Sequence, residues 1–135
     1  MKRVIYTLCL AALITGCKPS YEKVIDNYLN ENLKDPGSYE CIELGKPGII
    51  TPMSIAMVEA VKRAKAGEFP MDSVASKMTQ IKTMFEQKGT NPYDTLGWSV
   101  EHKYRAKNSY GGYEIESVTY IFDKHLKEIT ETRKK

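Results

Sequence analysis

The sequence predicts an α+β fold, in which an N-terminal helix and two middle helices pack on one face of a roughly four-stranded antiparallel sheet. Three observations support this prediction. Three segments before Gly89 carry apolar residues at helical spacing. After Asn91 and Pro92 the apolar residues alternate with polar ones, as in a half-buried strand. Two turn segments then divide the rest of the chain into a meander.

The first helix is predicted to begin at Ser20 and to end before Asp35. Ser20 can act as the N-cap, and Glu22 lies in the first turn, where a negative charge stabilises a helix. Pro36 moves the residue before it off helical geometry, and the Pro-Gly pair suits a turn. The apolar face of this helix consists of Tyr21, Val24, Ile25, Tyr28, Leu29 and Leu33.

A short strand is predicted at residues 38–44, and the glycines and proline of residues 45–48 break it. Cys41 lies in this strand. A lone cysteine in such a run is most often a small buried hydrophobic residue. We therefore expect Cys41 to be buried and unreactive.

Two helices are predicted between residues 51 and 89. Thr51 can cap the first helix, with Pro52 at its first helical position, and Gly67 can end it. Residues 72–73 offer a cap for the second helix, and Gly89 ends it. The expected inward-facing residues are Met53, Met57, Ala60, Val61 and Ala64 in the first helix and Val74, Met78, Ile81 and Phe85 in the second.

A β-hairpin is predicted from the alternation in residues 98–107 and from the Gly-Gly turn that follows it. A second turn at residues 123–125 leads into a last strand near residues 126–132. A hairpin turn centred on Tyr110 and Gly111 places basic residues opposite glutamates, and such pairs stabilise a sheet. This register predicts four cross-strand pairs: Lys107 with Glu114, Arg105 with Glu116, Ala106 with Ile115 and Val100 with Ile121.

The N-terminus has the features of an export signal. Lys2 and Arg3 precede an apolar run at residues 4–14, which is shorter than the about 20 residues that span a bilayer. The run leads into residues 14–17 (Ile-Thr-Gly-Cys), which resemble the lipobox of bacterial lipoproteins. An ordinary secretory signal with a chance cysteine is the alternative.

The lipobox resemblance implies cleavage before Cys17, a thioether from the Cys17 thiol to diacylglycerol, and acylation of the freed amine. It divides the chain into a signal peptide (residues 1–16), a lipidated tether (17–19) and a single α+β domain (20–135). Neither an aspartate nor an acidic run follows Cys17. By the same resemblance, these absences imply a position in the outer membrane, facing the periplasm.

Residues 33–40 and 106–114 resemble two motifs of small, largely uncharacterised bacterial lipoproteins and secreted domains. The first motif is a Lys-Asp-Pro-x-Ser turn after a helix, and the second is a Lys-Asn-x-x-Gly-Gly-Tyr hairpin. The resemblance implies a shared fold and brings no active site. Residues 45–92 lie outside the resemblance, which marks them as a candidate helical insertion.

Charge and composition exclude several ligand classes. The formal net charge is +3, and two of the positive charges belong to the signal, so there is no electrostatic case for nucleic acid. After processing, Cys41 would remain as the one free thiol, so no internal disulfide is expected. His102 and His125 lack the spacing of metal ligands. We expect no metal, cofactor or nucleic acid as a ligand.

The predicted hairpin supplies candidate contact residues. Its glycines would let a partner's backbone approach, and Tyr110 would serve as an exposed aromatic anchor. Turn geometry alone remains an alternative explanation, because Asn108 can bond its own turn. The candidate binding residues are Tyr110, Tyr113, Lys107, Arg105 and Asn108.

These features favour a non-catalytic, lipid-anchored module. It would contact the membrane through lipid on Cys17 and bind an unknown envelope protein or glycan. A second hypothesis is carriage of a small apolar ligand between the methionine-rich middle helices and the sheet. We expect these methionines chiefly to fill the core.

A third hypothesis is glycan hydrolysis by two carboxylates. The candidates are Glu101, Glu114 and Glu116. We expect these glutamates instead to form ion pairs with Lys103, Arg105 and Lys107.

Overall fold

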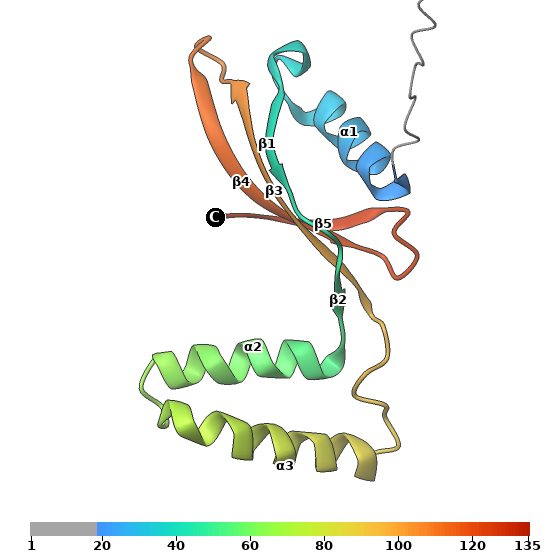
Figure 1. Ribbon diagram of the computed structural model, residues 1–135, viewed down its shortest axis with the longest axis vertical. Coiled ribbons are helices and arrows are strands. Elements are labelled where there is room, and N and C mark those ends of the chain that lie inside the picture. The colour runs from blue at the N-terminus through green and yellow to red at the C-terminus, as the bar shows by residue number, and fades with distance from the viewer. Residues whose placement is uncertain (1–18) are drawn as a thin grey trace, which may run out of the picture.

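The computed structural model describes residues 19–135 of the 135-residue chain. In this part of the chain, three α-helices accompany a five-stranded antiparallel sheet, which confirms the predicted α+β class (Figure 1). The predicted signal peptide (1–16), the lipid-bearing Cys17 and Lys18 lie outside the described residues. Within residues 19–135, none of the helices has the length and apolar character needed to cross a membrane.

The element boundaries follow the turn and cap residues closely. Thr51 caps the second helix as predicted: its Oγ1 accepts a hydrogen bond from the backbone N–H of Ser54 at 3.0 Å. Gly67, with φ of 81°, follows that helix. The helices are α1 (Ser20–Asn32), α2 (Pro52–Lys65) and α3 (Val74–Gln87), and the strands are β1 (Glu40–Leu44), β2 (Gly48–Ile50), β3 (Gly97–Lys107), β4 (Tyr113–Phe122) and β5 (Ile129–Lys134).

Strand β3 is the centre of the sheet. It pairs with β4 along one side, and β5 pairs with the other side of β4. Its remaining side pairs with β2 near its start, at residues 97–99, and with β1 at residues 102–105. The sequence did not predict β2, because three residues are too few to show alternation.

Helix α1 covers one face of this sheet (Figure 1). The predicted alternation in β3 is confirmed, since Val100, His102, Tyr104 and Ala106 are buried and face α1. Together with α1 and β4 they form the main hydrophobic core. Its largest fully buried side chains are Tyr120, Phe122, Ile25 and Val100.

The middle helices do not pack on the sheet as predicted. Helices α2 and α3 contact each other and project beyond the end of the sheet as a hairpin (Figure 1). The reason lies at their base, where β2 and β3 remain paired as far as Ile50 and Gly97. The chain therefore enters α2 and leaves α3 at the end of a strand pair. The hairpin has a small core of its own, made of Ala60, Ala64 and Val74.

The β3–β4 register differs by one residue from the predicted one. Lys107 pairs with Tyr113, and Arg105 pairs with Ile115. The loop between the strands is one residue longer than predicted, because the backbone N–H of Asn108 bonds the carbonyl of Gly112 at 2.8 Å. A one-residue shift moves every side chain of β4 to the other face.

The corrected register reverses the expected pattern in the first half of β4. Glu114 and Glu116 lie opposite Ala106 and Tyr104, on the face that α1 covers farther along. The aromatic Tyr113 and the aliphatic Ile115 lie on the open face and are 50% and 61% exposed. Charge and apolar patterning had therefore favoured a register that the turn does not allow.

Three further expectations fail in the N-terminal part of the domain. Cys41 is exposed instead of buried, because it lies on edge strand β1 beside an irregularity between Cys41 and Glu43. Ser38 belongs to a short 3₁₀-helix, Pro36–Ser38, so the strand begins two residues later than predicted. Pro19, rather than Ser20, holds the N-cap position of α1, without a side-chain cap.

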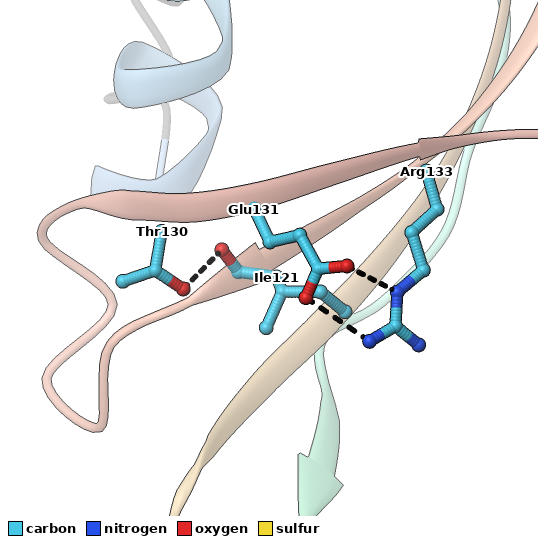
Figure 2. Close-up of polar contacts among 4 residues, drawn as sticks. All are labelled: Ile121, Thr130, Glu131 and Arg133. Carbon is cyan, nitrogen blue, oxygen red and sulfur yellow. Dashed lines mark hydrogen bonds and ion pairs between the residues drawn. The ribbon is translucent and has the colours of Figure 1, made fainter.

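Strand β5 forms the other edge of the sheet, and its polar side chains bond locally (Figure 2). The Thr130 hydroxyl donates to the Ile121 carbonyl at 3.2 Å. Arg133 makes two hydrogen bonds to Glu131, at 2.8 and 3.0 Å, and they lower the pKa of the Glu131 carboxyl. Charged side chains on an edge strand disfavour pairing with a further strand.

Candidate binding cleft and hairpin tip

A cleft lies between the C-terminal half of α1 and the ends of β3, β4 and β5. We call it the α1 cleft; its volume is about 270 Å³. Helix α1 contributes Tyr28, Leu29 and Asn32 on one side, and the hairpin residues Asn108 and Ser109 border the other. The floor is buried and mainly apolar, and consists of Leu29, Tyr104, Ala106, Val118 and Tyr120.

Two carboxylates form a wall of the α1 cleft. The Glu116 carboxylate accepts a hydrogen bond from the Tyr104 hydroxyl at 3.1 Å and forms an ion pair with the Lys134 ammonium at 2.7 Å. The Glu114 carboxylate accepts a hydrogen bond from the Asn108 side-chain amide at 2.8 Å. Lys34, Lys107 and Lys134 also line the cleft, so the two carboxylates lie among three basic side chains.

The hairpin loop beside the cleft is held by Asn108. Its side-chain oxygen accepts hydrogen bonds from the backbone N–H groups of Tyr110 and Gly112, both at 3.0 Å. Gly111 adopts φ of 81°, a conformation that glycine accepts without strain. This confirms the expected bonding of Asn108 within its own turn. The loop is ordered before any partner arrives.

Tyr110 stands at the tip of this ordered loop and is 97% exposed. Among residues 19–135, no packing or hydrogen bond of its side chain accounts for an aromatic residue there, whereas Asn108 and Gly111 have structural reasons for their positions. Tyr110 is therefore the residue of this loop that most clearly suggests a contact with another molecule.

The remaining candidate residues lie on the open face of the sheet. The Arg105 guanidinium pairs with Glu40 at 2.6 Å and lies 4.8 Å from the centre of the Tyr113 ring. Lys107 borders the α1 cleft, but its ammonium lies 5.6 Å from the same ring. The structure thus divides the five predicted residues into two groups. Asn108 and Tyr110 belong to the hairpin loop beside the cleft. Arg105, Lys107 and Tyr113 form a cation–aromatic cluster on the other face.

A buried histidine, His102, lies on β3 two residues before the floor residue Tyr104. The Nε2 atom of His102 lies 3.0 Å from the Tyr39 hydroxyl, and its Nδ1 atom lies 3.5 Å from the Tyr120 hydroxyl. Burial lowers the pKa of His102 and raises the pKa values of both tyrosines. The imidazole is therefore neutral near pH 7. Among the described residues, no group of three or more His, Cys, Asp or Glu could hold a metal ion.

The three glutamates of the glycan-hydrolysis hypothesis are separated by the sheet. Glu101 lies opposite Thr119 on the open face and pairs with Lys135 at 2.7 Å. Only Glu114 and Glu116 share a face. The expected partners Lys103, Arg105 and Lys107 are not those that the glutamates bond. For Glu114 and Glu116 the reason is the register, which differs from the predicted one.

The expected ligand site between the middle helices and the sheet does not form, since α2 and α3 project away from the sheet (Figure 1). Sequence reasoning also missed the α1 cleft. The signal that could have revealed it is the pair of glutamates at alternate positions of β4, next to an apolar segment that is buried. In comparisons with known proteins, no family model, curated protein or solved structure matches this chain.

Proposed function

We propose that this protein is a non-catalytic, lipid-anchored binding module of the bacterial outer membrane that faces the periplasm. The observation that carries the proposal is the exposed ring of Tyr110, on a loop whose backbone Asn108 holds and whose residues Asn108 and Ser109 line the α1 cleft. Because the loop is already ordered, little conformational entropy is lost when a partner binds.

Although three lysines also line the cleft, the Glu114 carboxylate favours a protein partner that presents a basic side chain. Glu116 already holds one ammonium group, that of Lys134, whose side chain is 73% exposed. Among the described residues, the Glu114 carboxylate accepts a hydrogen bond only from the neutral side-chain amide of Asn108. It can therefore accept a further, charge-assisted hydrogen bond from a basic group. Tyr110 would then pack on the partner's surface beside the inserted basic side chain.

Site-specific photocrosslinking in intact cells tests the binding site. A photoreactive amino acid replaces Ser109 in the full chain, next to Tyr110. We expect a defined crosslinked partner that is lost in a Tyr110→Ala background and reduced in a Glu114→Gln background. The matched control is Tyr113→Ala, which removes a half-exposed tyrosine from the other face of the same hairpin.

The absence of any adduct, or an adduct that survives Tyr110→Ala unchanged, would refute this binding site. Loss of the adduct in Tyr113→Ala to the same extent would move the contact to the cation–aromatic cluster. The stability of each variant is compared by thermal unfolding, so that loss of fold is not read as loss of contact.

The anchor is tested separately. Mass spectrometry of the mature chain should find an N-terminal Cys17 that carries acyl chains. Cys17→Ser should release the protein from membranes, because a lipid anchor contributes about 0.8 kcal/mol for each buried methylene. A Cys17→Ser protein that stays membrane-bound would contradict the anchor but not the binding site.

A further inference from the structure

We infer that the α2–α3 hairpin is a self-association surface, on which two copies of this chain pack their hairpins into a four-helix bundle. The inference concerns a different part of the molecule from the α1 cleft and does not depend on the partner proposed for that cleft. The hydrophobic core within the α2–α3 hairpin is small.

The hairpin leaves much of its apolar surface uncovered. Helices α2 and α3 bury three hydrophobic residues between them, and Phe69, Val61 and Met78 pack partly against these. Outside this core, Ile55 and Val58 of α2 are 53% and 69% exposed, and Met84 of α3 is 53% exposed. These three side chains do not line the groove described below, but they show that the projecting hairpin exposes apolar surface, which is typical of an interaction surface.

One face of the hairpin is hollowed into an open groove of about 610 Å³, which we call the hairpin groove. Methionines and one tyrosine dominate it, and both residue types are enriched in the centres of protein interfaces. Met57 and Tyr93 are 45% and 58% exposed there. The residues that line the groove include Met53, Met57, Ala75, Met78, Lys82 and Tyr93.

The charges around the hairpin groove match those of a second copy. Lys82 is the one charged residue among the described residues that line the groove, and Glu86 lies one turn further along α3, 3.8 Å from it. The two side chains form an ion pair within α3, and Glu86 lies beside the groove without lining it. A two-fold axis can bring Lys82 of one copy to Glu86 of the other, and the reverse pair then forms by symmetry.

This face offers no cluster of like charges that could pair with a strongly charged partner. A second copy presents the same apolar side chains and the same pair of opposite charges. Two helical hairpins that pack face to face make a four-helix bundle, which gives each helix a second neighbour for its apolar stripe. The geometry thus favours the same chain as occupant over a highly charged peptide.

The size of the face predicts a weak dimer. Each helix has 14 residues, which corresponds to a length of about 21 Å at a rise of 1.5 Å per residue. Two adjacent helices give a face about 20 Å wide, so two copies bury about 800 Å² of planar footprint. Interfaces below about 1,200 Å² are typically weak. Attachment of both copies to one membrane would strengthen the association by raising their effective concentration.

Sedimentation measurements test the inference on the full chain with Cys17→Ser, from micromolar to millimolar concentration. We expect a monomer–dimer equilibrium. Lys82→Glu and Glu86→Lys should each weaken it by about tenfold, because each places like charges opposite one another. Gln80→Glu is the matched control, since residue 80 is exposed on α3 and does not line the groove. It should leave the equilibrium unchanged.

Mixing the variants provides the decisive measurement. The Lys82→Glu chain and the Glu86→Lys chain, each weakly associating alone, should form a mixed dimer as tight as the wild-type dimer. The double variant Lys82→Glu, Glu86→Lys should also dimerise. Both substituted side chains are about half-exposed, so each chain should fold normally, which circular dichroism checks. A chain that is monomeric at every concentration, or variants that fail to complement each other, would overturn the inference.

Discussion

The hydroxyl of Ser38 accepts a hydrogen bond from the backbone N–H of Lys107 at 2.9 Å, across 69 positions of sequence. The same hydroxyl donates to the Asp35 carbonyl at 2.7 Å. One buried side chain therefore closes the turn after α1 and fixes the end of β3 beside it. This bond joins the two sequence motifs, the Lys-Asp-Pro-x-Ser turn and the Lys-Asn-x-x-Gly-Gly-Tyr hairpin.

Ser38→Ala should lower the free energy of unfolding by about 1–3 kcal/mol, because it leaves a partly buried backbone N–H without its partner. Urea denaturation at neutral pH measures the change. Ser109→Ala is the control, since Ser109 is exposed in the adjacent loop, and it should alter stability by less than about 0.5 kcal/mol. Equal stability of the two variants would show that the Ser38 bond contributes little.

Tyr39→Phe should destabilise the protein by about 1–2 kcal/mol. The substitution removes the hydroxyl that lies 3.0 Å from Nε2 of His102, a residue that is 2% exposed. Tyr113→Phe removes a hydroxyl from the open face and should have no measurable effect. Denaturation midpoints with an unchanged slope would establish that both variants unfold from the same native state.

Stability should decrease as the pH falls below about 6.5. Burial lowers the pKa of His102 in the folded protein below its usual value of 6.5, although Asp26 partly opposes the shift. Between the two pKa values the unfolded chain binds a proton that the folded chain does not, so acid favours unfolding. The stabilisation by the neutral imidazole is complete above the unfolded pKa and is lost below it.

Thermal unfolding between pH 7.5 and about pH 5.5 measures this dependence, in a range above the titration of ordinary carboxylates. His102→Phe should flatten the profile even though it lowers stability throughout, because it removes the titrating group. Exposed His125 remains in both proteins and serves as an internal control. An equally steep profile in His102→Phe would assign the dependence to other groups.

Gly97→Ala should destabilise the base of the α2–α3 hairpin by about 1–3 kcal/mol, the usual effect of overpacking. An added Cβ at this buried glycine would collide with the Phe122 carbonyl oxygen on β4. Gly112→Ala is the control, since its Cβ would meet the Asn108 side chain at an ordinary 3.7 Å. Hydrogen exchange should show the loss of protection in β2 and the start of β3, where residue 97 pairs.

Local patterning predicted most of the elements. The spacing of Ile25 and Leu29 predicts α1, Thr51 and Gly67 bound α2, and the alternation around Tyr104 predicts β3. These features depend on interactions within a few residues, so the sequence shows them directly. Strand β2 escaped prediction because its three residues are defined by their pairing with β3 and not by a pattern of their own.

The candidate site was predicted in part. Tyr110 and Asn108 could be identified because a Gly-Gly turn has a local signature. The α1 cleft could not, because Glu114 and Glu116 reach it only in the register that the loop imposes, and charge pairing favoured a neighbouring register. A shift of one residue costs little in local contacts, yet it exchanges the two faces of a strand.

The sequence by itself therefore determined the α+β class, the elements with strong periodicity, the turn residues and the expectation of a lipid-bearing Cys17. Tertiary structure decided the projection of α2 and α3 away from the sheet, the exposure of Cys41 and the face on which Glu114 lies. The physical reason is the range of the interactions. Propensity and capping act over one or two turns, whereas register and the packing of helices depend on contacts between segments far apart in the chain.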